Sequence, residues 1–365
     1  MKRQRFCSCL LASLAVVLCA LTPTVAAQSL SKGKGDLRVM TYNVDEGTDY
    51  YEVMAAKNAQ EFFFAVGQTI TQVRATDPPG RMTAVAKQII AAGPMLVSLQ
   101  ELDQWFTGSF NPSTGNCENV TLEFDMLSDL MGALEAQGGH YTIARQAQQW
   151  VIPPVPGFIP PNSLVCVGVV DYVAILARTD LRKFQWRNPQ SQQYVNELLF
   201  PTPLGVIPFP RAWISVDATF NGKNFRVIGT HLESADPDIR RKQGEELRTG
   251  PANVSLPVVV AMDSNAQAFP LPQDPTYLDF LLAGYQDVWS QIFPNLPGYT
   301  SGQAQFLDNV ESQLNTRIDL ILTLGTVEAQ NIALFGATQS SKTPGGLWPS
   351  DHAGVAAQLN IEKHE

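Results

Sequence analysis

The stretch Leu256–Asn265 places the tightest constraint on how this chain folds. Its sequence is LPVVVAMDSN, so an apolar run of β-branched residues leads directly into Asp263 and Asn265. A short run of this kind predicts a strand that is buried on both faces. Residues two apart at a strand end point to the same side, so both polar side chains can meet one bound group. The alternative is that the pair only forms a turn.

The same change from an apolar strand to a polar residue recurs along the chain. The other segments are LRVMTYN ending at Asn43, MLVSLQE ending at Glu101, FRVIGTH ending at His231, RIDLILTL with Asp319 near its start, and Ser350-Asp351-His352 before GVAAQL. Sheet proteins place their active sites at strand ends, where loops add specificity. We therefore expect these polar side chains to form one site.

Six short motifs in this set resemble, in their order, the endonuclease/exonuclease/phosphatase superfamily, which has the DNase I-like fold. They are TYNV at 41–44, LQE at 99–101, GTHLE at 229–233, MDSN at 262–265, RIDLIL at 317–322 and SDH at 350–352. Each motif is unspecific alone, but together they cover almost all of the chain after its N-terminus. The resemblance implies an α/β (α+β) four-layer sandwich, in which two packed mixed β-sheets are flanked by helices.

The N-terminus has the pattern of an export signal. Residues 1–27 begin with Lys2, Arg3 and Arg5, continue with an apolar stretch and end in Val-Ala-Ala. This pattern predicts a cleaved signal peptide and a secreted or periplasmic protein, with a retained anchor as the alternative. No later run is long enough to span a membrane. We expect residues 28–35 to form a flexible segment and residues 36–362 to form a single catalytic domain.

Charge and cysteine content narrow the classes of function. Loss of the signal removes three basic and no acidic residues, which changes the formal charge from −9 to −12. Such an acidic protein lacks the electrostatic footprint of a DNA-packaging protein, although a nuclease that needs only brief contact is not excluded. The mature chain keeps Cys117 and Cys166, which predicts one disulfide, with two free thiols as the alternative. No protein partner is indicated.

The helix and loop predictions rest on periodicity and proline content. Helical spacing is found in 61–73, 81–91 and 119–138. The segments Trp150–Pro161 and Phe200–Arg211 are rich in proline and apolar residues, which predicts long surface loops. The acidic and aromatic stretch 45–51 is expected to be a solvated loop.

Hydrolysis of a phosphoester requires a cation, a base, hydrogen-bond donors and an acid. The oxygen-bearing side chains at the strand ends suit Mg²⁺, with Mn²⁺ or Ca²⁺ as alternatives. The resemblance implies that Glu101 is the principal metal ligand, with Asn43 beside it, and that Asp351 is a ligand or lies next to one. It also implies that Asp263 orients the attacking water and that Asn265 holds the phosphate.

Further roles follow from the same resemblance. His352 is similar to the histidine at the phosphate, and Asp319 to the carboxylate that orients its ring. His231 is similar to a second histidine that contacts the phosphate or the leaving group, although no carboxylate partner for it is evident. Tyr172 and Arg211 stand where the family often has a Tyr and an Arg that contact phosphate.

The sequence therefore predicts a secreted, divalent-metal-dependent phosphoesterase. It would hydrolyse a phosphodiester or phosphomonoester by metal-assisted attack of water. A small or lipid-like substrate is favoured, because neither Trp150–Pro161 nor Phe200–Pro210 contains Lys or Arg. The alternatives are a secreted DNase I-like nuclease and a catalytically silent binding scaffold. The intact polar set argues against the scaffold.

Overall fold

Two parallel strand pairs occupy the centres of two large sheets. In the computed structural model, β1 (Leu37–Asn43) runs parallel to β2 (Leu96–Gln100), and β11 (Lys223–His231) runs parallel to β12 (Val258–Asp263). These are four of the strands that the sequence predicts. Each combines a buried apolar run with a polar residue at or just after its carboxyl end.

The structure describes residue 30, residues 37–161 and residues 163–362. The predicted signal peptide lies outside the described residues. The same holds for the predicted flexible segment, apart from Leu30. Within the described part of the chain, no helix is long and apolar enough to cross a membrane.

The first large sheet has eight strands, in the order β15-β16-β1-β2-β6-β3-β4, with β5 paired to β6. Besides β1 and β2, its strands are β3 (Gln104–Asn111), β4 (Asn116–Asp125), β5 (Tyr141–Ile159), β6 (Ser163–Arg178), β15 (Val327–Phe335) and β16 (Gly354–Ile361). Strand β5 has a partner on one side within this sheet, so it is an edge strand.

The second large sheet has six strands, in the order β13-β14-β12-β11-β10-β7. Besides β11 and β12, its strands are β7 (Phe184–Gln193), β10 (Ala212–Phe220), β13 (Gln286–Asp287) and β14 (Asp319–Leu324). A separate two-stranded hairpin consists of β8 (Leu198–Thr202) and β9 (Gly205–Phe209).

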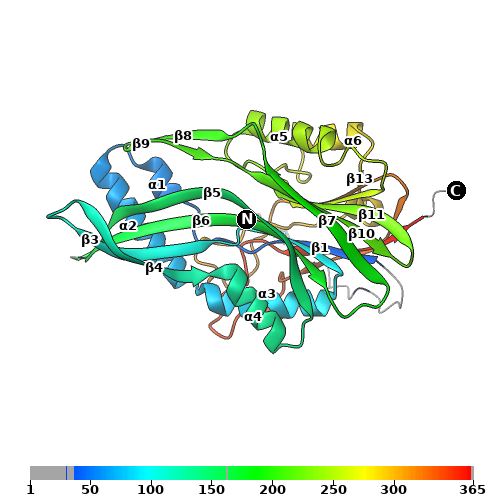
Figure 1. Cartoon of the computed structure of the whole chain (residues 1–365), viewed down its shortest axis with the longest axis horizontal. Helices are drawn as coiled ribbons and strands as arrows, with labels where there is room; N and C mark the ends of the chain where they lie inside the picture. The colour runs from blue at the N-terminus through cyan, green and yellow to red at the C-terminus, as the bar shows by residue number, and fades with distance from the viewer. Residues whose placement is uncertain (1–29, 31–36, 162, 363–365) are drawn as a thin grey trace, which may run out of the picture.

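Helices cover the outer faces of both sheets. They are α1 (Tyr51–Ala55), α2 (Ala59–Ala75), α3 (Pro78–Ala92), α4 (Met126–Ala136), α5 (Pro237–Thr249), α6 (Pro275–Leu282), α7 (Val288–Ile292) and the short 3-10 helix η1 (Gln339–Ser341). Helices α3 and α4 lie below the sheets in Figure 1, and α5 and α6 lie above them. The helices predicted at 61–73 and 81–91 are confirmed as α2 and α3.

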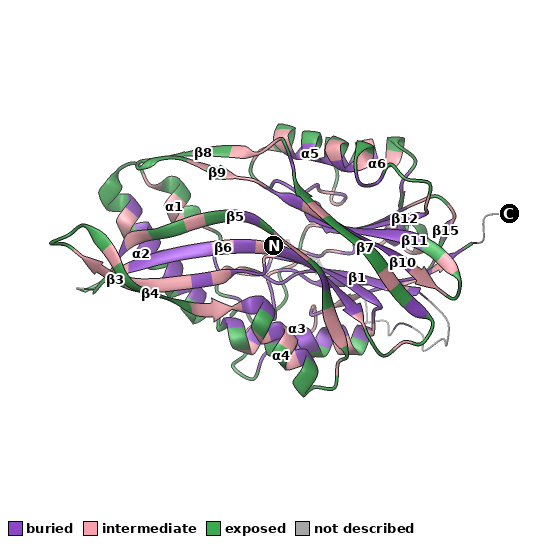
Figure 2. Ribbon diagram, viewed as in Figure 1, coloured by how far each residue is buried: buried purple, intermediate pink, exposed green. Residues whose placement is uncertain are grey.

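The two large sheets pack face to face over a shared apolar core. Val39 and Ile175 of the first sheet belong to the same buried cluster as Val227 and Val259 of the second. Figure 2 shows that burial is concentrated on the central strands, whereas β7 and the β8–β9 hairpin are largely exposed or partly buried. The predicted four-layer α/β sandwich is confirmed.

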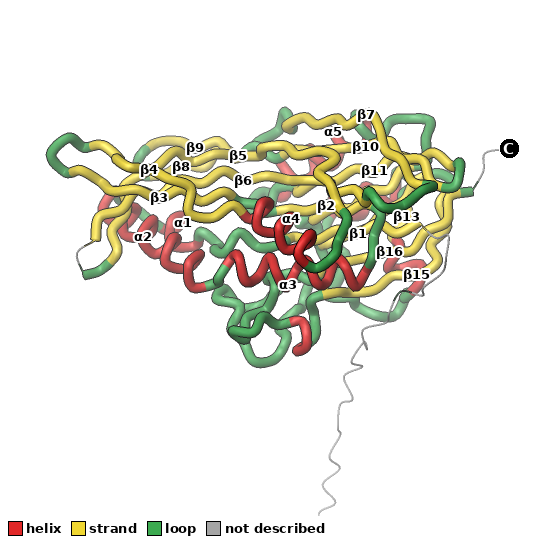
Figure 3. The backbone as a smooth tube through the Cα atoms, turned by 60° about the horizontal axis from the view of Figure 1, so that its bottom comes forward, coloured by secondary structure: helices red, strands yellow, loops and turns green. Residues whose placement is uncertain are grey.

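One end of the molecule is an extension that we call the arm, formed by α1, α2, β3, β4 and the adjoining parts of β5 and β6. In Figures 1 and 3, the β8–β9 hairpin extends toward this same end. A disulfide between Cys117 of β4 and Cys166 of β6 links two strands of the arm, as the sequence predicts.

The structure corrects both loop predictions. Residues 150–159 belong to strand β5, and residues 200–209 form most of the β8–β9 hairpin. Proline lacks the N–H that a central strand needs, but an edge strand or a bulge tolerates it. The pairing of β5 with β6 shifts register between Ile152 and Val155, where two prolines stand. The hairpin has two strands, so both of them are edges.

The helix predicted at 119–138 is also wrong in its first part. Residues 116–125 form strand β4, which pairs with β3, and the helix begins only at Met126. The Asp125 carboxylate accepts a hydrogen bond from the backbone N–H of Ser128, which caps the helix at this point. Strand pairing and this cap override the helical spacing upstream of them.

Substitution of Gly67 by alanine tests the close packing of α2 on β5. A Cβ atom on Gly67 would lie 2.0 Å from the carbonyl oxygen of Phe158, so the backbone must shift. We expect Gly67→Ala to lower the free energy of unfolding by about 2 kcal/mol, measured by chemical denaturation. The control is Gly132→Ala in α4, where no atom lies within 4 Å; it should raise stability by roughly 0.5–1 kcal/mol. Equal effects of the two substitutions would contradict the packing.

Candidate active site

Strand register places the predicted polar residues at one edge of the sandwich. Asn43 pairs with Gln100 across β1 and β2, and His231 pairs with Asp263 across β11 and β12. Asp263 also pairs with Asp319, the first residue of β14. Carboxyl ends of parallel strands meet at the same edge, and β14 begins there because it runs antiparallel to β12.

Asn43 joins the two sheets at this edge. Its Nδ2 donates to Oε1 of Glu101 at 2.7 Å and to Oδ2 of Asp263 at 2.9 Å. Its Oδ1 accepts from the backbone N–H of Asp45 at 2.9 Å. The prediction that Asn43 lies beside Glu101 is met, but the residue positions two carboxylates and does not direct its oxygen toward them as a shared metal ligand would.

Glu101 stands at the first residue after β2 in a left-handed conformation with φ of 59°. Its Oε2 accepts from the backbone N–H of Glu46 at 3.0 Å. A non-glycine residue in this conformation costs free energy, and such residues cluster at functional sites. The strained turn directs the Glu101 carboxylate toward Asn43.

His352 and Asp319 form the expected pair, with Nδ1 and Oδ2 separated by 2.8 Å. Both side chains are buried. The other ring nitrogen, Nε2, faces the carboxylates of Asp351 at 3.7 Å and Asp263 at 3.9 Å. The Asp319 carboxylate therefore fixes the proton on Nδ1 and the orientation of the ring.

His231 has a cationic neighbour instead of a carboxylate partner. Its Nδ1 lies 3.0 Å from Nη1 of Arg211. Its Nε2 lies 2.9 Å from Nδ2 of Asn265 and 3.5 Å from Oδ2 of Asp263. A guanidinium group and an amide NH₂ group both donate hydrogen bonds, so each ring nitrogen of His231 faces a donor.

The two histidines consequently differ in charge. Burial lowers the pKa of His231 well below its usual range, and the Arg211 guanidinium lowers it further. Burial also lowers the pKa of His352, but the Asp319 and Asp351 carboxylates outweigh burial and hold it well above its usual range. Near neutral pH the site holds a neutral His231 and a protonated His352.

The carboxylates of this edge fit a divalent cation. Burial raises the pKa of Glu101 to about 8, with repulsion from Asp351 adding to it. Burial likewise raises the pKa of Asp351 to about 7. Ligand atoms of Glu101, His231 and Asp263 lie within 4.8 Å of one another. Carboxylates held close together without a compensating cation are a donor set suited to a hard metal ion such as Mg²⁺.

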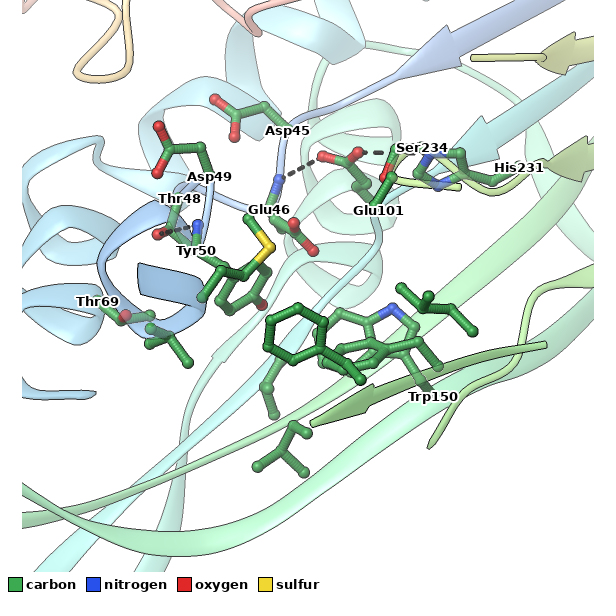
Figure 4. Close-up of a pocket in the computed structure, with 18 of the residues that line it drawn as sticks. Asp45, Glu46, Thr48, Asp49, Tyr50, Thr69, Glu101, Trp150, His231 and Ser234 are labelled. Atoms are coloured by element: carbon green, nitrogen blue, oxygen red, sulfur yellow. Dashed lines mark hydrogen bonds and ion pairs between the residues drawn. The ribbon is translucent and has the colours of Figure 1, made fainter. Parts of the chain in front are cut away.

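A cavity of about 440 Å³ joins this polar set to an aromatic region. Its polar end includes most of the predicted site residues: Glu101, Arg211, His231, Asp263, Asn265, Asp351 and His352. Its other end is lined by side chains from the arm and the β8–β9 hairpin, namely Tyr50, Phe62, Trp105, Trp150, Phe200 and Phe209. Figure 4 shows Glu101 and His231 on one side of this cavity and Tyr50 and Trp150 on the other.

Solved structures share this arrangement of sheets and helices. An endonuclease/exonuclease/phosphatase family protein from Bacteroides thetaiotaomicron matches with a TM-score of 0.53 and 16% identity, over 90% of this chain and 98% of that one. A family member from Bacteroides vulgatus has a TM-score of 0.53 and 15% identity, over 90% and 100%. The human Nocturnin catalytic domain, with bound sulfate, has a TM-score of 0.51 and 15% identity, over 90% and 95%.

This chain has the DNase I-like fold.

The fold that the six short motifs imply is thus confirmed by structural neighbours. No family model and no curated protein matches the sequence. At 15–16% identity, the neighbours establish the DNase I-like fold and leave substrate and roles to be argued from the site itself.

Tyr172, a predicted substrate contact, is not among the residues that line the cavity. It packs against the apolar cluster to which α3 and α4 contribute. Adjacent residues of a strand point to opposite faces, and the preceding residue, Asp171, points toward Arg211 with 3.8 Å between Oδ2 and Nη1. Arg211 does line the cavity, as predicted.

The loop predicted at 45–51 is not fully solvated. Asp45 is 6% exposed and lines the cavity together with Glu46 and Tyr50. Arg81 of α3 anchors this loop, because its guanidinium donates hydrogen bonds to the backbone carbonyls of Val44 and Asp45. The residues after β1 therefore form a fixed part of the cavity wall.

Sequence reasoning also missed a group of buried carboxylates around Arg211. Oε2 of Glu233 lies 3.7 Å from its Nε, and Asp171 lies on its other side. Asp103 is completely buried nearby. A usable signal was present, because Asp103 follows Glu101 by two residues and Glu233 follows His231 by two, the same spacing as in Asp263 and Asn265.

The raised pKa of Glu101 predicts how metal-free stability depends on pH. Between the ordinary glutamate pKa of 4.5 and about 8, the folded protein binds this proton more tightly than the unfolded chain, so stability falls as pH rises through that window. Glu101→Gln removes the effect. We expect the fall in thermal midpoint from about pH 5 to about pH 8 to be smaller in the variant than in the wild type by at least about 2 °C. An identical fall in both proteins, measured by calorimetry in EDTA, would contradict the assignment.

Proposed function

We propose that this protein is a divalent-metal-dependent phosphoester hydrolase that uses water as the nucleophile. The observation that carries the proposal is the direct contact of Asn43 with Glu101 and Asp263, beside the His352–Asp319 pair. The Glu101 carboxylate suits a metal, the Asp263 carboxylate suits water, and the protonated His352 faces Asp263. The substrate is a phosphodiester or a phosphomonoester.

Glu101 and Asp351 would hold the cation, which we propose to be Mg²⁺, with Mn²⁺ or Ca²⁺ as alternatives. When bound, the cation neutralises phosphate oxygens and so lowers the barrier to attack. His231 lies 3.8 Å from Glu101 through Nε2. His231 therefore stands beside the proposed metal site.

The remaining steps belong to side chains of this chain. Asp263 accepts a hydrogen bond from water and takes its proton as the new oxygen–phosphorus bond forms. The side-chain amide of Asn265 donates to a phosphate oxygen, and the His231 ring contacts the phosphate or the leaving group. As the bond from phosphorus to the departing oxygen breaks, that oxygen takes a proton from Nε2 of His352. We assign the acid role to His352 because it is held protonated, whereas His231 is neutral.

We also propose that the protein is exported and that residues 36–362 form one catalytic domain. Export rests on the sequence of residues 1–27. The disulfide between Cys117 and Cys166 supports it, since such bonds persist in oxidising compartments.

A DNase I-like nuclease remains the second reading, because aromatic side chains in the cavity can stack on bases. Among the described residues that line the cavity, however, Arg211 is the single Lys or Arg side chain. A polyanion would find little neutralising charge here, so a small or lipid-like phosphoester is the preferred substrate. A silent scaffold is disfavoured by the complete polar set.

Removal of the metal tests the proposed chemistry directly. Turnover of a generic aryl phosphodiester should vanish in EDTA and return with Mg²⁺. Glu101→Gln should lower kcat/KM at least about a hundredfold, since a bound cation supplies several kcal/mol. The control is Glu135→Gln, the same change at an exposed position of α4, which should retain full activity. Full wild-type activity in EDTA would refute metal dependence, and plasmid cleavage without turnover of small esters would favour the nuclease.

The His352–Asp319 pair makes a separate prediction. If Asp319 acts only through His352, then Asp319→Ala and His352→Ala should each reduce kcat strongly. The kcat of the double variant should be close to that of the less active single variant. Thermal midpoints of all three proteins provide the control for misfolding. Multiplication of the two single losses in the double variant would count against the pairing as a catalytic unit.

A further inference from the structure

We propose that the aromatic end of the cavity binds an organic ammonium group, such as a quaternary alkylammonium, that the phosphoester substrate carries. The inference rests on the proposed function for the position of the phosphate near Glu101. It identifies the chemical class of the group attached to that phosphate. Two independent features support it: the aromatic walls and the unbalanced negative charge beside them.

The walls of this aromatic chamber come from elements distant in the sequence. We define it by Tyr50 after β1, Trp105 of β3, Trp150 of β5 and Phe209 of β9. The ring of Tyr50 stacks on that of Trp105 with centroids 6.2 Å apart and meets the ring of Trp150 edge-on at 5.7 Å. Phe209 lies 5.2 Å from Trp150. Aromatic rings arranged around a cavity attract an alkylated cation through their negative faces.

Glu46 lies between this chamber and the catalytic carboxylates. Its backbone N–H donates to Glu101, and its carbonyl accepts from Nε1 of Trp105 at 3.1 Å, so the residue is fixed to both. Figure 4 shows its carboxylate between Glu101 and Trp150. Within the described part of the chain, that carboxylate has no hydrogen-bond donor and no ion-pair partner.

The surroundings add negative charge and little positive charge. Asp103 is completely buried, and neither of its carboxylate oxygens has a hydrogen-bond partner among the described residues. The hydroxyl of Tyr50 is buried and equally unpartnered there. Arg211 lies between Asp171 and Glu233, so its charge is already shared. Seven carboxylate residues line the cavity: Asp45, Glu46, Asp49, Glu101, Glu233, Asp263 and Asp351.

These features select among four kinds of ligand group. A second phosphate would face carboxylates without a compensating cation. An uncharged apolar group would suit the rings but would leave the acidic side chain of Glu46 without a polar partner, which costs free energy. An ammonium group with alkyl substituents packs on the rings and meets the acidic side chain of Glu46. A bare metal ion would lack oxygen ligands at the aromatic walls.

Two substrates that differ only in charge test the inference. They are para-nitrophenyl phosphorylcholine and para-nitrophenyl neohexyl phosphate, in which a quaternary carbon replaces the nitrogen. Both are diesters with the same leaving group. We expect kcat/KM for the choline ester to exceed that for the neohexyl ester about tenfold or more, a size typical of a partly desolvated cation–π contact with a nearby carboxylate. Equal values would overturn the inference.

Variants locate the preference within the chamber. Glu46→Gln should reduce the ratio of the two kcat/KM values to nearly one. The matched control is Glu135→Gln, the same change at an exposed position of α4 that does not line the cavity. It should leave the ratio unchanged. Because both substrates are measured on one preparation, the ratio is independent of the fraction folded.

A second pair of variants tests the rings. Trp150→Leu should lower the ratio, whereas Val151→Leu, on the adjacent residue of β5 that is 46% exposed, should not. An unchanged ratio in both Glu46→Gln and Trp150→Leu would overturn the placement of the cation.

Failure of the proposed function is distinguishable from failure of this inference. If neither diester is hydrolysed, titration calorimetry with choline and with neohexanol on the metal-free wild type decides the question. Binding of choline that Glu46→Gln abolishes would support an ammonium site without the proposed chemistry. Absence of choline binding, or equal affinity for neohexanol, would overturn it.

Discussion

The active site depends on one amide that holds two carboxylates from opposite sheets. Asn43 ends β1 in the first sheet, whereas Asp263 ends β12 in the second, and Nδ2 of Asn43 contacts both Asp263 and Glu101. Two buried carboxylates repel each other unless donors and a fixed frame hold them. That frame is the apolar core between the sheets, so the site geometry is set by packing far from the chemistry.

The difference in charge between the two histidines also depends on partners that the fold holds in place. His231 and His352 stand near one carboxylate, Asp263, at 3.5 Å and 3.9 Å from its Oδ2. The other nitrogen of each ring, Nδ1, contacts a charged side chain. That side chain is the cationic Arg211 for His231 and the anionic Asp319 for His352. One fold thus keeps a neutral histidine and a protonated histidine side by side, because each partner is fixed by its own strand or turn.

Much of this site could be predicted from the sequence because each motif is local. A buried apolar run followed by a polar residue identifies a strand and its functional end, and register then brings the ends together. The errors arise where the direction or the burial of a side chain depends on its position in the folded sheet and not on the local sequence. Tyr172 and Asp171 are adjacent in β6, so their side chains point to opposite faces, and it is Asp171 that points toward Arg211. The burial of Asp45 depends on Arg81, which no local pattern connects to it.

Proline in β5 has a consequence for the behaviour of the protein in concentrated solution. An unprotected edge strand exposes a row of N–H and C=O groups that can recruit a second chain into a shared sheet. Strand β5 is long and lies at an edge, but its prolines remove donors and its register shifts bend the ladder. The same prolines that made the sequence predict a loop therefore also prevent another molecule from pairing with β5. The arm can thus carry apolar residues around the aromatic chamber without polymerising through this edge.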